Sequence, residues 1–163
     1  ILKSYKFKER IDDSKKLSAR KREKAYREIL EKCVVGIGIV DEKIIDRINI
    51  YQATKRAMQI AISNLELPPD FVIVDGKMKI VTKCPLKCIV GGDSKSLSIA
   101  AASIIAKVTR DRIMLEYDGI YPQYGFARHK GYGTKAHMEV LKTNGASPIH
   151  RRSFNPVKNM VKA

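Results

Sequence analysis

The chain has 163 residues, of which 44% are hydrophobic, enough to fill the core of one globular domain. Its 32 Lys and Arg residues outnumber its 17 Asp and Glu residues and leave a net charge of +15. That charge favours nucleic acid as the partner, although a lysine-rich solvated surface would have the same composition. No apolar run reaches the roughly 18 residues of a membrane span, and residues 1–10 lack the apolar block of a signal peptide.

The cysteines number three, an odd count in a chain that is large enough to fold without disulfides. We therefore expect reduced thiols and a cytoplasmic protein that makes no membrane contact. Cys84 and Cys88 have neither a second cysteine pair nor a closely spaced histidine, so we expect no zinc site.

Two helices and a strand are predicted in the first part of the chain. Ser18 is a typical N-cap for a helix over residues 19–32, with Ala25, Ile29 and Leu30 on its apolar face and basic residues on the other. Residues 34–40 are rich in β-branched side chains and predict a strand. Residues 46–65 predict a second helix, which the prolines at 68 and 69 end.

Two apolar strands are predicted to end in aspartates. Residues 71–74 form a continuous apolar run, typical of a central strand covered on both faces, and Asp75 follows it. Residues 88–90 predict a shorter strand that leads into Gly91, Gly92 and Asp93. A helix over residues 96–117 is apolar on nearly every face and is expected to be buried. The pattern predicts an α/β fold with sites at the carboxyl ends of strands.

Asp75 and Asp93 are the candidate catalytic residues and metal ligands. Each comes directly after a predicted strand and beside glycine, which allows a bulky ligand to approach. Paired carboxylates suit Mg²⁺ or Mn²⁺, and in a basic protein they suit phosphodiester hydrolysis. The spacing alone leaves another interpretation open, in which Asp75 belongs to a turn and Asp93 caps a helix.

Four segments in order carry a resemblance to one family. They are DSKKLS at residues 13–18, GDSKSLSIAAASIIAKVTRDR at 92–112, YPQYGFARHKGYGT at 121–134 and SPIHRRSF at 147–154. Together they strongly resemble ribonuclease HII, the type 2 ribonucleases H. The resemblance implies a ribonuclease H-like mixed sheet flanked by helices, with a C-terminal helical extension. Residues 1–118 would form the core, and residues 119–163 the loop and helical extension of the same domain.

The resemblance also implies a site of four acids that holds two divalent ions. Asp75 would be the third acid and Asp93 the fourth. The first two are an adjacent Asp-Glu pair in a segment that continues Ala-Gly-Arg-Gly, and this segment also contacts the ribose 2′-hydroxyl. We expect the sequence given to start just after that segment, so that the first strand of the core is missing.

Substrate-binding residues follow from the same resemblance. Tyr132 would stack on the sugar next to the cleavage junction, and its neighbours would supply charge for phosphates: Arg128, His129 and Lys130. Duplex-backbone contacts are expected from Lys15, Lys16 and Lys95. Lys107 is a further candidate, with a structural ion pair as an equal alternative.

Two more charged segments are given structural roles. Asp111 lies between two arginines late in a predicted helix and is expected to form a salt bridge rather than to act in the site. The run His150, Arg151 and Arg152 could bind phosphate, but we favour a role in tying the tail to the body of the domain.

The implied activity is that of a metal-dependent endonuclease, acting in DNA replication and repair as a monomer. It would hydrolyse the RNA strand of RNA–DNA hybrids and cut duplex DNA 5′ to embedded ribonucleotides, leaving 3′-hydroxyl and 5′-phosphate ends, with two Mg²⁺ or Mn²⁺ ions. Two alternatives remain. The chain could be a non-catalytic nucleic-acid-binding fragment, since two acids are absent, or belong to the related ribonuclease HIII, although the match through Tyr132 favours HII.

Overall fold

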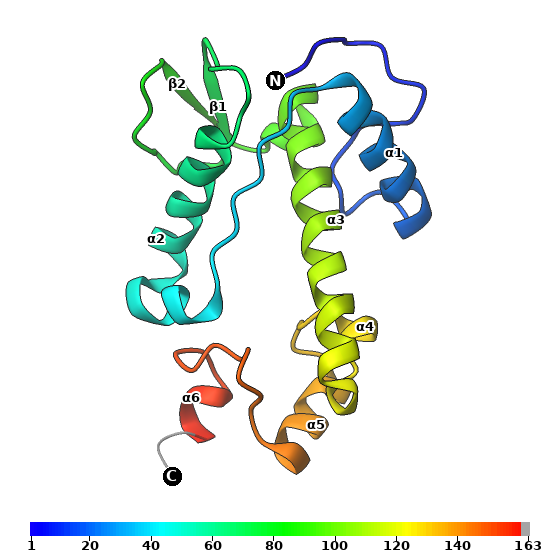
Figure 1. Cartoon of the computed structure of the whole chain (residues 1–163), viewed down its shortest axis with the longest axis vertical. Helices are drawn as coiled ribbons and strands as arrows, with labels where there is room; N and C mark the ends of the chain where they lie inside the picture. Colours follow the sequence, from blue (N-terminus) through cyan, green and yellow to red (C-terminus); the bar gives the residue numbers. More distant parts are fainter. Residues whose placement is uncertain (161–163) are drawn as a thin grey trace. The chain divides into compact units, whose positions relative to one another are not determined.

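The computed structural model describes residues 1–160, which fall into two compact units. The first, called the strand unit here, comprises Ile1–Ile39 and Thr54–Val108. The second, called the helix unit, comprises Val40–Ala53 and the chain from Thr109 onward. Two long helices, α2 (Glu42–Ser63) and α3 (Leu97–Ile120), each contribute residues to both units (Figure 1). The predicted α/β fold is confirmed. No described helix is long and apolar enough to cross a membrane.

Helix α1 (Ala19–Lys32) has the predicted bounds and the predicted cap. The Ser18 side chain accepts a hydrogen bond from the Lys21 amide at 3.3 Å. Ala25 and Ile29 are buried as expected, but Leu30 is 45% exposed, so its assignment to the apolar face was wrong. Glu28 of the same helix is also buried, and its carboxylate accepts hydrogen bonds from the backbone amides of Lys8 and Glu9 in the N-terminal segment.

Residues 34–40 do not form the predicted strand. Among the described residues, positions 34–40 themselves are in no strand, and an isolated bridge joins Leu2 to Cys33, just before this segment. Its backbone lies directly against α2: a Cβ added to Gly36 would lie 2.0 Å from the Ala61 carbonyl oxygen. The β-branched composition was therefore misleading, because a strand needs a paired neighbour and this segment instead uses its glycines to approach a helix.

Helix α2 begins earlier than predicted and contains a break. Asn49 has φ 66° and ψ 165°, outside the helical region. Its side-chain oxygen accepts a hydrogen bond from the Gln52 amide at 3.1 Å, so Asn49 acts as a cap for the turns that follow. This combination of φ and ψ lies outside the left-handed helical region and is strained for a residue with a Cβ, and apolar periodicity could not reveal it.

The sheet consists of two parallel strands, β1 (Val72–Asp75) and β2 (Leu86–Ile89). No further strand pairs with them among residues 1–160, so the predicted mixed sheet is not seen there. Val74 is buried, whereas Phe71 is 53% exposed. The expectation of a strand covered on both faces was therefore wrong for the described part of the chain.

The core of the strand unit lies between α1 and α3, which run close together in Figure 1. It comprises Leu17, Ala25, Tyr26, Ile29, Ala101, Ile104, Ile105 and Val108. Helix α3 buries only one face in this core, because Ala102 and Ala106 are exposed. The prediction that α3 is buried on nearly every face was too strong, since its outer positions carry small residues that need no cover.

The helix unit continues after α3 with short helices. They are α4 (Phe126–His129), α5 (Lys135–Asn144) and α6 (Val157–Met160). Thr134 caps α5, since its hydroxyl accepts a hydrogen bond from the His137 amide at 3.3 Å. The core of this unit is formed by Tyr124, Phe126, Leu141 and Val157.

Candidate active site and nucleic-acid interface

The two candidate acids lie at neighbouring strand ends of the strand unit. Asp75 is the last residue of β1, and its Oδ1 accepts a hydrogen bond from the Gly92 amide at 2.8 Å. Asp93 follows Gly92 in a single 3-10 turn, Gly92–Ser94. The parallel register pairs Asp75 with Ile89, so the carboxyl ends of β1 and β2 lie at the same edge of the sheet. The structure therefore brings the two predicted acids into the same local region.

Gly91 and Gly92 make this close approach possible. Gly91 has φ 66°, in the left-handed region that favours glycine. A Cβ on Gly92 would lie 2.4 Å from Cδ1 of Ile99, a buried residue of α3, and 3.4 Å from Oδ1 of Asp75. A side chain at Gly92 would therefore require the tip of the Ile99 side chain to shift, whereas its approach to Asp75 would be an ordinary van der Waals contact.

The donor chemistry of this edge fits a hard divalent cation. Asp75 is exposed, and its second carboxylate oxygen and the whole carboxylate of Asp93 make no hydrogen bond to the described residues. Mg²⁺ commonly takes one or two carboxylates and completes its shell with water and substrate phosphates. Residues 1–160 bring together no group of three or more side chains suited to a metal.

Two of the candidate lysines of the strand unit, Lys95 and Lys107, follow Asp93 in the chain. Lys95 donates a hydrogen bond from Nζ to the Val90 carbonyl oxygen at 2.7 Å, which holds its charge on the loop that carries Asp93. Lys107 is half-buried on α3. Lys95 thus keeps its charge on the loop that carries Asp93, and Lys107 stays a candidate for both roles considered for it.

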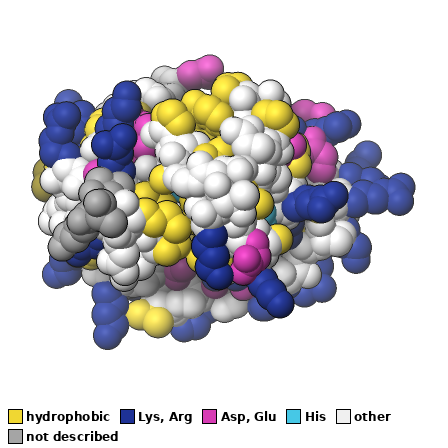
Figure 2. All heavy atoms as spheres, turned by 90° about the horizontal axis from the view of Figure 1, so that it is seen from below, with side chains coloured by type: hydrophobic (Ala, Val, Ile, Leu, Met, Phe, Trp, Pro, Cys, Tyr) yellow, Lys and Arg dark blue, Asp and Glu magenta, His cyan; other side chains and the backbone are white. Residues whose placement is uncertain are grey.

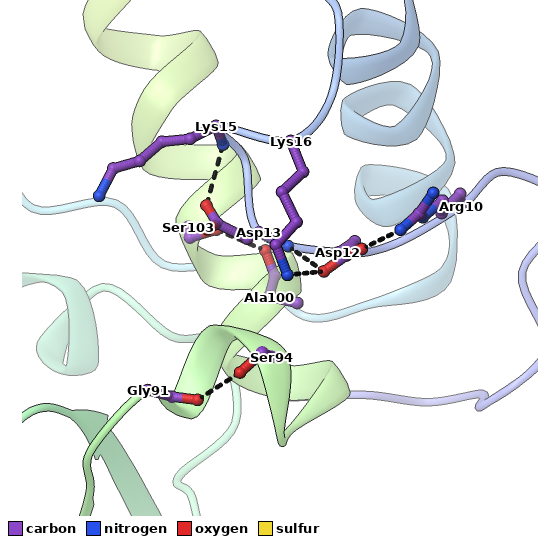
Figure 3. Close-up of polar contacts among 9 residues, drawn as sticks. All are labelled: Arg10, Asp12, Asp13, Lys15, Lys16, Gly91, Ser94, Ala100 and Ser103. Atoms are coloured by element: carbon purple, nitrogen blue, oxygen red, sulfur yellow. Dashed lines mark hydrogen bonds and ion pairs between the residues drawn. The ribbon is translucent and has the colours of Figure 1, made fainter.

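Lys15 and Lys16 lie in the loop before α1 (Figure 3). Asp13 shapes the loop by accepting a hydrogen bond from the Lys15 amide at 2.9 Å. Lys16 Nζ lies 3.6 Å from Asp12 Oδ1, so its charge is partly shared. The Lys15 side chain extends away from this cluster in Figure 3, is exposed and forms no ion pair with the described residues. Lys15 is the freer of the two for a phosphate contact.

Tyr132 is exposed in the helix unit and is held by the turn before it. Its amide donates to the His129 carbonyl oxygen at 2.8 Å, and the turn needs positive φ at Lys130 (50°) and Gly131 (73°). The guanidinium carbon of Arg110 lies 4.6 Å from the centre of the Tyr132 ring. With 54% of the residue exposed, the ring keeps surface available for stacking.

The three residues grouped with Tyr132 differ in what they can offer. Arg128 is exposed and Lys130 half-buried, so both stay candidates for phosphate contacts. His129 is 8% exposed, and both ring nitrogens are used: Nε2 donates to the Tyr124 carbonyl oxygen at 2.8 Å, and Nδ1 accepts from the Gly131 amide at 3.1 Å. These bonds and its burial give His129 a role in shaping the loop, and its expected phosphate contact stays a prediction.

A cluster of the chain's three histidines was not foreseen from the sequence. The rings of His129 and His137 stack at 4.1 Å, and Nε2 of His137 lies 3.0 Å from Nε2 of His150. His137 Nδ1 donates to the Tyr132 carbonyl oxygen, and His150 Nδ1 accepts from the Ser147 amide. Each contact then has one donor if all three rings are neutral. Their sequence spacing gave no sign of this network.

Acidification should destabilise this histidine cluster. Burial, with the neighbouring His137, lowers the pKa of His150 from 6.5 to about 4. The unfolded chain therefore takes up a proton at a higher pH than the folded chain, and stability is full above pH 6.5 and falls as the pH approaches 4. We expect a loss on the order of 1–2 kcal/mol, allowing for partial exposure.

Urea unfolding between pH 7.5 and 4.5 measures this effect. A His150→Asn variant, which cannot take up the proton, should show a smaller loss than the parent chain. Equal pH dependence in the two proteins would contradict the role given to His150.

The tail of the helix unit is tied to α2 by a carboxylate. Asp46 accepts hydrogen bonds from the backbone amides of Arg152, at 2.7 Å, and Ser153, at 2.9 Å. These backbone hydrogen bonds support the structural role that we favoured for residues 150–152, which is to tie the tail to the body of the domain. The side chains of Arg151 and Arg152 take no part in this link.

Comparison with known proteins identifies the family. A model of the ribonuclease HII family matches residues 3–157. The chain belongs to the ribonuclease HII family. It is 54% identical over 152 residues to a ribonuclease HII of Enterococcus faecalis V583, and 54% identical over 153 residues to one of Bacillus cytotoxicus. Each alignment covers 93% of this chain but 59% of the relative, so the chain is shorter than these ribonucleases HII.

The fold is also similar to a solved member of the type 2 group. The ribonuclease H2 of Pyrococcus horikoshii OT3 superposes with a TM-score of 0.77 at 24% identity, covering 93% of this chain and 80% of that one. At this identity the likeness concerns the fold alone.

Proposed function

We propose that the full-length protein is an endonuclease that hydrolyses the RNA strand of RNA–DNA hybrids and cuts duplex DNA 5′ to embedded ribonucleotides. The observation that carries the proposal is the bond between Asp75 and the Gly92 amide, which joins two acid-bearing strand ends. Membership of the ribonuclease HII family supports the same substrate.

The proposed reaction is hydrolysis of one phosphodiester. Water attacks the phosphorus, the bond to the 3′ oxygen of the preceding nucleotide breaks, and the products carry a 3′-hydroxyl and a 5′-phosphate. Two Mg²⁺ or Mn²⁺ ions, when bound, would activate the water and stabilise the leaving oxygen. Asp75 and Asp93 would hold their free carboxylate oxygens at the strand edge, where Lys95 keeps positive charge nearby.

Binding of the duplex would rest on positive charge and on one aromatic contact. The net charge of +15 suits a polyanion, and Figure 2 shows more Lys and Arg than Asp and Glu side chains on the face displayed. We assign phosphate contacts to Lys15, Lys16, Arg128 and Lys130. The exposed ring of Tyr132 would stack on a sugar of the substrate.

The larger architecture is part of the proposal. We infer that β1 and β2 belong to a mixed ribonuclease H-like sheet in the full-length protein, with the elements after Ile120 as its helical extension. The relatives are longer than this chain, so we infer that the remaining acids lie outside it. For the 163-residue chain alone, a second candidate function is binding of nucleic acid without cleavage. The reason is that its described residues bring together only part of the proposed metal site.

Cleavage of three labelled duplexes tests the proposal. The full-length protein with Mg²⁺ or Mn²⁺ should cut an RNA–DNA hybrid, leave an all-DNA duplex of the same sequence intact, and lose activity with a chelator. The 163-residue chain should bind the hybrid in a mobility-shift assay but cut it far more slowly. A folded full-length protein that binds the hybrid and cuts none of it would make a binding protein the better description.

A further inference from the structure

Two arginines of the helix unit are stacked on aromatic rings. Arg110, on α3, lies over Tyr132 with 4.6 Å between its guanidinium carbon and the ring centre. Arg151 lies over Phe154, with the corresponding distance at 3.7 Å. Stacking occupies the flat face of a guanidinium and leaves its N–H groups, which lie in the plane at the edge, free to bind other groups.

Neither guanidinium has an acceptor in the part of the protein that the structure describes. Among residues 1–160, Arg110 and Arg151 donate no hydrogen bond and form no ion pair within 4.0 Å. Asp46 is the acid that acts on Arg151, but its carboxylate oxygens already accept bonds from Arg152 and Ser153. The N–H groups of both arginines are therefore available to a ligand.

The two positive charges also act on each other. Burial lowers the pKa of Arg151, the charge of Arg110 lowers it further, and Asp46 only partly opposes both. Hydrogen bonds place both arginines in one region, because His137 links the Tyr132 carbonyl oxygen, at 2.9 Å, to Nε2 of His150, at 3.0 Å, and His150 precedes Arg151. Two like charges in one region repel, and a shared anion removes that repulsion. Arg151 is half-buried, so it is not a freely solvated surface side chain.

We propose that Arg110 and Arg151 together bind one backbone phosphate of the nucleic acid, next to the sugar that stacks on Tyr132. The planar fork of arginine matches phosphate oxygens with two parallel hydrogen bonds, and phosphate contacts fix register on a duplex. Arg110 would thus have two tasks, supporting the Tyr132 ring and binding phosphate. The proposal rests on the proposed function, because it takes Tyr132 as a substrate contact.

The test uses full-length protein and a duplex with one ribonucleotide, bound without divalent ion so that no cleavage occurs. In a series of duplexes, one phosphate at a time is replaced by an uncharged methylphosphonate. The parent protein should lose about 10-fold in affinity at one linkage near the ribonucleotide. Arg110→Met and Arg151→Met should each bind the unmodified duplex about 10-fold more weakly and no longer respond to the change at that linkage.

Further variants separate this contact from a structural effect. The double variant should bind about as weakly as either single variant, since one phosphate is shared. Arg110→Lys keeps the charge and should lose only a few-fold. Arg47→Met, an exposed arginine of the same unit, should respond to the modification as the parent does. The inference is overturned if folded Met variants keep the parent's sensitivity at that linkage. A parent protein that binds the duplex but does not cut it with Mg²⁺ would instead contradict the proposed function.

Discussion

Replacement of Asp75 or Asp93 by Asn in the full-length protein should lower hybrid cleavage by at least about 10³-fold and change hybrid affinity by less than about threefold. Asn keeps the size of Asp and an acceptor for the Gly92 amide, so the link of β1 to the 3-10 turn should survive. The negative charge that a hard cation requires is lost. Turnover and binding are therefore expected to separate.

Asp70→Asn is the matched control for these two variants. Asp70 is exposed and lies just before β1, away from the strand ends that carry the candidate acids. It should cleave at the parent rate. Single-turnover rates with Mg²⁺ and mobility shifts without it measure the two properties. Parent-like turnover in both Asp75→Asn and Asp93→Asn would refute their assignment as metal ligands.

Gly38→Ala should be the most damaging single methyl addition in the strand unit. The new Cβ would lie 1.9 Å from the carbonyl oxygen of Ala57 and 2.7 Å from the amide nitrogen of Ala61. Both are backbone atoms of α2, which cannot move aside as a flexible side chain would. We expect unfolding free energy to fall by about 2–4 kcal/mol, at the upper end for overpacking.

Gly119→Ala is the control for that substitution. Gly119 lies in α3, and a Cβ there would meet nothing within 4 Å. Ala has the higher helix propensity, so this variant should be unchanged or more stable by up to about 1 kcal/mol. Urea unfolding at pH 7.5 compares the two. Equal midpoints for Gly38→Ala and Gly119→Ala would show that the segment does not pack on α2 as described.

Local signals in the sequence were sufficient for the elements that local interactions determine. The Ser18 cap and the apolar spacing after it predicted α1 to the residue, because a cap is satisfied by its own helix. The break at Asn49 is a local cap on Gln52 that apolar spacing does not reveal. The irregular course of residues 34–40 depends on α2, which lies later in the chain. The two glycines in that segment were the available sign, since glycine within a strand pattern often marks a close backbone approach.

The candidate site also has parts that the sequence predicts and parts that depend on distant contacts. The sequence placed Asp75 and Asp93 next to the ends of two predicted strands, and the structure brings them into one region, because Asp75 ends β1 and Asp93 lies in the turn after its parallel neighbour β2. The burial of His129 could not be predicted, because it depends on Tyr124 and on the stacked ring of His137. The stacking of Arg110 on Tyr132 likewise joins α3 to a later loop. No spacing rule predicts such contacts between distant segments.

The most direct test of the proposed activity is to map the cut made by the full-length protein in a DNA duplex that contains one ribonucleotide. With Mg²⁺ or Mn²⁺, we predict a single nick on the 5′ side of the ribonucleotide, with a 3′-hydroxyl that a polymerase can extend and a 5′-phosphate on the ribonucleotide. A nick on the 3′ side, cutting of the all-DNA duplex at the same rate, or no nick by folded protein would contradict the proposed activity.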